Sequence, residues 1–244
     1  MGEGKGKLFH PYITRIKSDN GWRGAIKKGS NHSFELLLIG HAIDWIDEIK
    51  SGFELKKLIS LTGPEGHQVP FEFLGFDNQE FKGPINIDQI LEGYAPNNKI
   101  VEPLKKVTIN FISPYCTKFQ GKIITDPNRM DFEVFLASIY ERIKGLAENH
   151  CGFNGIVPDK NQFLISATNI ENNPHEDFRF VSNKAIKESA NGKKEEEKIG
   201  GLKGRITFKG ELTEYLPMII LGEELHIGKD TTQGLGRYKI MDMT

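Results

Sequence analysis

A glycine-rich segment near the carboxyl end of the chain carries the residue types best suited to chemistry. Residues 224–239 read ELHIGKDTTQGLGRYK, with glycines at positions 228, 234 and 236. Glycine adopts positive φ readily and lets another backbone approach closely, and successive backbone N–H groups in such a loop form a concavity that binds anions. Lys229 and Arg237 add positive charge, while two threonines and Gln233 offer neutral donors. This composition suits a phosphate group.

The spacing excludes two common phosphate-binding motifs. The P-loop pattern G-x4-G-K-[ST] is absent, and the glycines of a dinucleotide-binding fingerprint should follow a strand and open a helix. Here a predicted helix comes first, and residues 238–240 are typical of a closing strand. A glycine-rich turn that only closes a sheet fits the same spacing, so the pattern by itself leaves both interpretations open.

The cysteines and histidines give no indication of a metal site or of a redox function. Cys116 and Cys151 form no CxxC pair, so two buried free thiols in a reducing compartment are expected. The sequence His175-Glu176-Asp177 contains ligand types, but three adjacent side chains do not easily converge on one ion, and a solvated turn is the better interpretation. We therefore expect no metal and no cofactor.

The elements that must hold the glycine-rich segment begin with a strand and a long helix. Residues 106–112 alternate apolar and polar side chains, the pattern of a strand with one buried face, and Pro114 is expected to end it. Asp131 is a natural N-cap for the helix that follows, and Asn149 or Gly152 a natural stop. One apolar stripe runs along this helix, formed by Phe132, Phe135, Leu136, Ile139, Ile143, Leu146 and Ala147.

The rest of the second half completes an α+β pattern. Strands are predicted at residues 163–170, 178–181, 202–209 and 238–240, and a helix from Thr213 to about Gly222. The charged segment 182–201 is predicted to be a mobile loop. The resulting order, β-α-β-β-α-β, is that of the ferredoxin-like unit, a four-stranded antiparallel sheet with two helices on one face. Many RNA-binding proteins share this architecture, and so do many enzymes.

The first half is predicted to form a separate domain. Strands are expected at residues 8–16 and 33–39, the second well buried, followed by an amphipathic helix over 41–50 that stops at Gly52. Two further β segments, 55–62 and 71–76, flank a turn. Residues 77–103 are rich in Asn, Pro and Gly, so we place the boundary near Pro96–Pro103, with domains at 1–100 and 101–244.

Composition is that of a globular protein without a membrane span. The 244 residues are 38% hydrophobic, and the longest fully apolar runs have four residues, far short of a span. Nothing at the start is typical of a signal peptide, so a cytoplasmic location is expected. The net charge of −1 argues mildly against nucleic acid, although the field near a groove depends on where charges sit.

The same carboxyl-terminal residues resemble those of a known protein family. LHIGKDTTQGLGRYKI, residues 225–240, closely resembles the C-terminal glycine-rich loop of the CRISPR-associated repeat-processing endoribonucleases of the RAMP superfamily. GGLKGRITFKGELTEYLPMIILGEE, residues 200–224, resembles the strand and helix before that loop. HPYITRI (10–16), FELLLIGHAIDWI (34–46) and VTINFISPYCTKFQGKI (107–123) resemble earlier parts of the family in the same order. The likeness spans nearly the whole chain.

The resemblance implies a fold and a reaction. It implies tandem ferredoxin-like (RAMP/RRM-like) domains, the first of which lacks its opening strand and helix here and is expected to be incomplete at its N-terminus. It also implies that the partner is CRISPR repeat RNA and that one metal-independent cut occurs within the repeat. In that cut a ribose 2′-hydroxyl attacks the adjacent phosphate and leaves a 2′,3′-cyclic phosphate and a 5′-hydroxyl. Histidine with lysine or arginine would supply the acid, base and cationic support.

The family's chemistry points to particular side chains. His226 lies two residues before the first loop glycine and His41 heads the first predicted helix, so both are candidate catalytic residues. His226 equally suits a role in holding the loop. The candidate RNA-binding residues belong to the loop, to the strand before the last helix and to the segment after residue 115; they are Gly228, Lys229, Gly234, Gly236, Arg237, Lys203, Arg205, Lys118 and Lys122.

Two other functions compete with the endoribonuclease. A non-catalytic RAMP subunit of a CRISPR effector complex would bind RNA without cutting it, and the incomplete first domain favours this reading. A ferredoxin-like protein that binds a small phosphorylated ligand would show no salt-sensitive affinity for RNA, and the near-neutral charge is its support. Other CRISPR effector subunits and a homodimer are compatible with the sequence.

Overall fold

A computed structural model describes residues 9–17, 31–55, 58–62, 68–76, 89–90, 103–119, 121–153, 159–188 and 194–244. Most of the expected boundary at Pro96–Pro103 lies outside the described residues. No helix in these ranges combines the length and apolar character needed to cross a bilayer.

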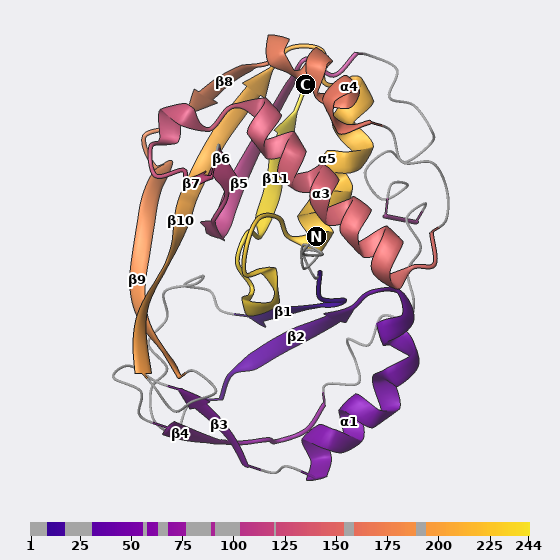
Figure 1. Cartoon of the computed structure of the whole chain (residues 1–244), viewed down its shortest axis with the longest axis vertical. Coiled ribbons are helices and arrows are strands. Elements are labelled where there is room, and N and C mark those ends of the chain that lie inside the picture. The colour runs from indigo at the N-terminus through magenta and orange to yellow at the C-terminus, as the bar shows by residue number, and fades with distance from the viewer. Residues whose placement is uncertain are drawn as a thin grey trace, which may run out of the picture.

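The second half of the chain forms one antiparallel sheet with helices on a single face (Figure 1). The strands lie in the order β11-β5-β10-β8, and β9 also pairs with β10. Their bounds are β5 Lys106–Tyr115, β8 Glu171–Pro174, β9 Arg179–Glu188, β10 Lys194–Lys209 and β11 Tyr238–Met243. Helices α3 (Phe132–His150) and α5 (Leu216–Leu225) cover the sheet. The prediction of an α+β, ferredoxin-like arrangement is confirmed.

Alternation along β5 and periodicity along α3 build the core between these layers. Val107, Ile109 and Phe111 are fully buried, whereas the residues between them face the other side of the sheet. Asp131 caps α3 as predicted, since its carboxylate accepts a hydrogen bond from Val134 N at 3.1 Å. The ring of Phe135 meets that of Phe111 edge to face, so the predicted apolar stripe and strand face each other.

Shorter elements link these layers. They are β6 (Lys118–Phe119), β7 (Lys122–Ile123), α4 (Lys160–Ile165) and the 3-10 turns η4 (Pro127–Arg129), η5 (Ser166–Asn169), η6 (Thr213–Tyr215) and η7 (Thr231–Gln233). The predicted strand over residues 163–170 is wrong, because α4 and η5 occupy it. Leu164, Ala167 and Ile170 are buried at a spacing of three residues, which suits a helical turn. A short apolar run does not distinguish a strand from a buried helix.

The mobile loop predicted over residues 182–201 is also wrong, because β9 and β10 extend through most of it as a long hairpin. Its register sets Lys187 opposite Glu195 and Glu188 opposite Lys194. Continuous backbone pairing thus forms strands here without the apolar pattern on which the prediction relied. Two boundaries also move: β5 passes through Pro114 to Tyr115, and α5 continues past Gly222 to Leu225.

The first half contains the predicted strand pair and helix. Strand β1 (Tyr12–Lys17) pairs antiparallel with β2 (Ser33–Leu38), and β3 (Leu58–Thr62) pairs with β4 (Gln68–Glu72). A 3-10 turn, η1 (Gly40–Trp45), leads into α1 (Ile46–Leu55), which runs through Gly52 instead of stopping there. No residue of β2 is buried, contrary to expectation. An apolar run indicates burial only if layers cover both faces, and β1 is the one described strand that pairs with β2.

Candidate functional site

The glycine-rich segment is a loop that leaves α5 at His226 and returns to the sheet at Tyr238. Its backbone enters the left-handed region repeatedly, with φ of 86° at Gly228, 81° at Gly234 and 70° at Gly236. His226 (φ 52°) and Asp230 (φ 58°) do so without being glycine, which costs free energy for a residue with a Cβ. In Figure 1 this yellow loop reaches from the end of α5 to β1, in the first half of the chain.

Each loop glycine makes a different close approach. A Cβ on Gly236 would overlap the carbonyl oxygen of Ile227 inside the loop, and one on Gly228 would overlap that of Cys116. A Cβ on Gly234 would lie 2.7 Å from the carbonyl oxygen of Thr14 in β1. The loop therefore packs against itself, against the end of β5 and against β1, so it does more than close a sheet.

Several loop amides are used to hold the loop in place. Lys229 N donates to Cys116 O at 2.9 Å, and Gly236 N donates to Pro114 O at 2.9 Å. Ile227 N donates to Gly236 O at 3.1 Å, and Arg237 N to Ser113 Oγ at 2.8 Å. These four donors are not available to a phosphate, so positive charge for a ligand must come chiefly from side chains.

Three exposed lysines gather where the loop meets the end of β5; we call Lys118, Lys122 and Lys229 the lysine patch. Lys229 N donates to Cys116 O at 2.9 Å, which brings the backbone of Lys229 to within two residues of Lys118. Burial and Asp230 raise the pKa of the Cys116 thiol, whereas Lys229 and Lys118 lower it. Lys122 follows in β7, where it pairs with Phe119 of β6. Lys203 is next to Leu202, which pairs with Tyr115 in β5.

The two predicted arginines lie in different surroundings from the lysine patch. Arg205 pairs with Asn110 farther along the sheet and donates from Nε to Asp177 Oδ2 at 2.9 Å. Arg237 is partly buried; burial and the Arg15 charge lower its pKa, against Glu35, Glu224 and Glu223, which raise it. Both arginines therefore lie close to acidic side chains.

The open face of the sheet carries hydrogen-bonding side chains. His175 Nε2 lies 2.8 Å from Thr207 Oγ1, which lies 2.8 Å from Thr108 Oγ1. With His175 bound to Thr207 and Asp177 to Arg205, the sequence at 175–177 is a turn, as expected, and no group of three potential metal ligands occurs in the described ranges.

His226 is enclosed. Its side chain is fully buried, and Nδ1 lies 3.3 Å from the carbonyl oxygen of Leu235 across the loop. Burial, with the charges of Arg15 and Arg237 adding to it, lowers the pKa of this imidazole to about 3. At neutral pH the ring is uncharged, and it joins the beginning of the loop to its end.

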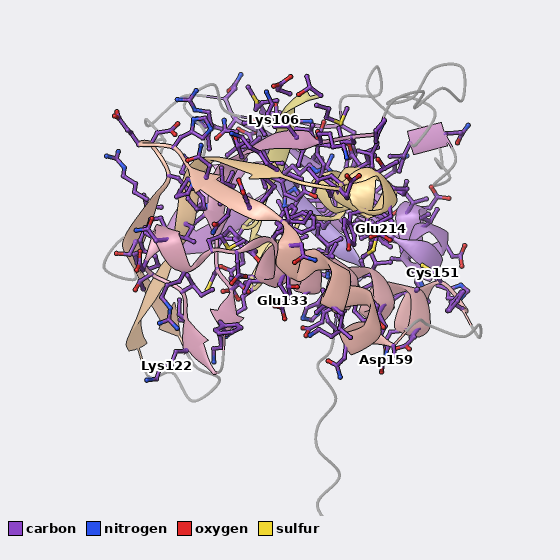
Figure 2. The ribbon with its side chains drawn as sticks, turned by 90° about the horizontal axis from the view of Figure 1, so that it is seen from above. Lys106, Lys122, Glu133, Cys151, Asp159 and Glu214 are labelled. Atoms are coloured by element: carbon purple, nitrogen blue, oxygen red, sulfur yellow. The ribbon has the colours of Figure 1, made fainter. Side chains whose placement is uncertain are left out.

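His41 lies in η1 with its side chain 73% exposed and Nδ1 3.7 Å from Asp44 Oδ2. Its Nε2 faces Gly152, just beyond α3. Figure 2 shows Cys151, the neighbour of Gly152, on the opposite side of the view from Lys122. The structure therefore does not bring His41 to the lysine patch.

A known protein family matches the same part of the chain. The family model for the CRISPR-associated endoribonuclease Cas6 matches residues 109–238, more than half of the chain and all of the glycine-rich loop up to β11. The chain belongs to the Cas6 family. No curated protein sequence matches this Cas6 chain.

Solved structures agree on the fold at low sequence identity. A Cas6 product complex matches 95% of this chain and 81% of its own chain at 13% identity and a TM-score of 0.54. A second one matches 98% and 84%, at 13% identity and a TM-score of 0.51. A partial Cas6-RT-Cas1–Cas2 complex matches 96% of this chain at 17% identity and a TM-score of 0.58, and our Cas6 chain spans 39% of the chain matched there.

Sequence reasoning missed two arginines that contact the base of the loop in this Cas6 chain. Arg142 is buried in α3 and donates to Leu225 O, and Arg15 in β1 donates to Glu224 O. A signal for each was present. Arg142 falls within the apolar stripe, three residues after Ile139, and Arg15 follows the buried Ile13 on one face of β1.

Proposed function

We propose that this Cas6 chain binds the repeat of a CRISPR precursor RNA in the cytoplasm and cuts it once by a metal-independent reaction. The observation that carries the proposal is the lysine patch at a glycine-rich loop that lies within the residues matched by the family model. Lys118, Lys122 and Lys229 supply the cationic contacts that dominate affinity for a phosphate backbone. The net charge of −1 is compatible with this, because the charge is local.

The proposed reaction is an internal transfer at phosphorus. A base removes the proton from a ribose 2′-hydroxyl, and the oxygen attacks the adjacent phosphate. The bond from phosphorus to the 5′-oxygen breaks, and an acid protonates the departing oxygen. The products are a 2′,3′-cyclic phosphate and a 5′-hydroxyl. Lysines at the phosphate oppose the negative charge that grows in the transition state.

Of the two histidines predicted to be catalytic, His41 is accessible for proton transfer, whereas His226 is enclosed and uncharged at neutral pH. A general acid or base is most effective with a pKa near the working pH. We propose that His226 holds the loop and that His41 exchanges protons with RNA extending from the lysine patch. His10 joins it as a candidate, since this exposed residue bonds through its carbonyl to Arg142 at the base of the loop.

A second candidate function is RNA binding without cleavage, as a RAMP subunit of a larger complex. One observation favours it: His226, the histidine of the glycine-rich loop itself, is fully buried. The matched Cas6-RT-Cas1–Cas2 complex is one kind of assembly in which such a chain would act. A homodimer is a further arrangement that we propose to test by sedimentation with and without RNA.

A cleavage assay separates these functions. Labelled repeat RNA is incubated with the chain in EDTA, and the ends of the products are analysed. The endoribonuclease predicts one cut with a cyclic-phosphate end, lost in His41→Ala or in His10→Ala, with His32→Ala as the exposed-histidine control. Binding without a cut supports the RNA-binding subunit. Neither binding nor cleavage, at any salt concentration, would refute both.

A further inference from the structure

Two arginines from different domains bind the last carbonyl groups of α5. Arg15 in β1 donates from Nη2 to the backbone oxygen of Glu224 and, at 2.8 Å, to its carboxylate. Arg142 in α3 donates from Nε to Leu225 O at 3.2 Å and from Nη1 to His10 O at 3.5 Å. The last carbonyls of a helix have no partner within the helix and form the negative end of its dipole. We call Arg15 and Arg142 the arginine clamp.

Both side chains of the arginine clamp are largely shielded from solvent. Arg142 is 3% exposed and the side chain of Arg15 is 13% exposed. Arg15 faces the carboxylates of Glu224, at 2.8 Å, and Glu35, at 3.9 Å. For Arg142 the helix end supplies the compensating negative charge. Burial lowers its pKa to about 10, which still leaves it charged at neutral pH. A buried charge is costly unless it is compensated, so the clamp depends on the position of the end of α5.

The residue after the clamped carbonyls begins the glycine-rich loop. His226 leaves α5 with φ 52° and ψ 150°, and Gly228 then passes against Cys116 O. The first domain also meets the far part of the loop, where Gly234 approaches Thr14 O in β1. One strand of the first domain thus contacts the loop at its base and at its tip.

We propose that Arg15 and Arg142 are positioning residues that set the path of the loop and place Lys229 beside Lys118, without contacting RNA themselves. The part of this inference that concerns RNA rests on the proposed function. The part that concerns the loop is independent of it, because Gly228 and Lys229 of the loop pack against the backbone of a buried cysteine. Cys116 is buried beside Lys229 and Asp230, and the other cysteine, Cys151, is exposed.

Thiol reactivity tests the position of the loop. In a Cys151→Ser background, reaction of Cys116 with an aromatic disulfide reports how often the loop lifts. Arg142→Met keeps the volume of the side chain but removes its donors, and we expect the reaction to accelerate at least about tenfold, which is about 1.4 kcal/mol of lost protection. Arg142→Lys should recover part of the protection, and the exposed Arg129→Met should not change the rate. An unchanged rate in folded Arg142→Met would refute the positioning role of the arginine clamp. If Arg142→Met does not fold, Arg15→Gln is the second variant, and we expect the same acceleration of the thiol reaction.

The salt dependence of RNA affinity separates positioning from contact. Lys229→Gln should reduce the slope of log K against log salt by about 0.7–0.9, as expected for one lost phosphate contact. Arg142→Met should weaken binding about fivefold or more with the slope unchanged, the fraction of active protein being checked by stoichiometric titration. An equal loss of slope in Arg142→Met would show that it contacts RNA and would overturn the assignment. If the parent protein does not bind RNA, the proposed function fails, and the thiol rates still decide the clamp.

Discussion

His226 shows how burial changes the role of a residue whose type suggests catalysis. An exposed histidine titrates near pH 6.5 and can exchange protons at neutral pH. Full burial among Arg15, Arg142 and Arg237 keeps His226 neutral, and its Nδ1 faces Leu235 O. A neutral ring that spans the loop contributes to the stability of the loop, whereas the exposed His41 and His10 keep access to solvent.

A pH-dependent loss of stability follows from this burial. The folded pKa of about 3 lies below the ordinary 6.5, so between these values the unfolded chain binds the extra proton and stability falls as pH falls. From pH 7.5 to pH 5 this histidine should remove about 2 kcal/mol from the free energy of unfolding. Urea unfolding of the wild type and His226→Gln at both pH values measures it, since other groups cancel in the difference. A constant difference between the two proteins would show that His226 titrates normally.

At the scale of the element, the glycine-rich loop and α5 act as one unit with the end of β5. Glu223 in α5 is buried and accepts hydrogen bonds from Lys239 Nζ at 2.6 Å and from Ile240 N at 2.9 Å, which ties the helix to β11. The loop between these elements has little freedom, because Gly236 and Gly228 press against carbonyl oxygens of Ile227 and Cys116. Its shape therefore depends on having no side chain at these positions.

Substituting alanine for a loop glycine tests whether the conformation of the loop requires glycine at that position. Gly236→Ala adds a Cβ at φ 70° that overlaps Ile227 O, and should cost about 2 kcal/mol or more of stability and reduce RNA affinity. Gly52→Ala in α1 is the matched control, because an added Cβ there meets nothing within 4 Å, and helix propensity predicts a gain of up to about 1 kcal/mol. Thermal unfolding and RNA titration of both variants check this. Equal behaviour of the two variants would contradict the role given to the loop.

At the scale of the whole molecule, the first and second halves of the chain meet through backbone as well as side chains. Gly40, at the start of η1, lies against the carbonyl oxygen of His150 at the end of α3, with φ 59°. Arg142 adds a bond to His10 O, and the loop adds contacts to β1. These contacts join the first half of the chain to the C-terminal half of α3 and to the loop.

Gly40→Ala should loosen the contact between η1 and the end of α3. Its Cβ would overlap His150 O at a positive φ, so we expect about 2 kcal/mol of destabilisation or more. Because the strain lies between the two halves of the chain, unfolding should lose cooperativity, the first half unfolding before the second. Urea unfolding followed by tryptophan fluorescence, which reports Trp22 and Trp45, both in the first half of the sequence, and by far-UV circular dichroism tests this. Coincident transitions at the wild-type midpoint would contradict it.

Local sequence patterns determined much of the secondary structure of this protein. Alternation over residues 106–112, the apolar stripe after Asp131 and the glycines at 228, 234 and 236 depend on neighbours in the chain, so β5, α3 and the loop were predictable. The strand at 163–170 and the loop at 182–201 were mispredicted, because packing of Leu164 and pairing of β9 with β10 depend on distant partners.

The candidate site divides in the same way. Residue types and resemblance pointed to Lys229, Lys118 and His226, but burial is a property of the assembled fold. Tertiary structure alone decided that His226 is enclosed, that His41 lies away from the lysine patch, and that Arg15 meets Glu224 across 209 positions of sequence. Such contacts carry no local signature, since the sequence separation of two residues says nothing about which domain surfaces will pack together.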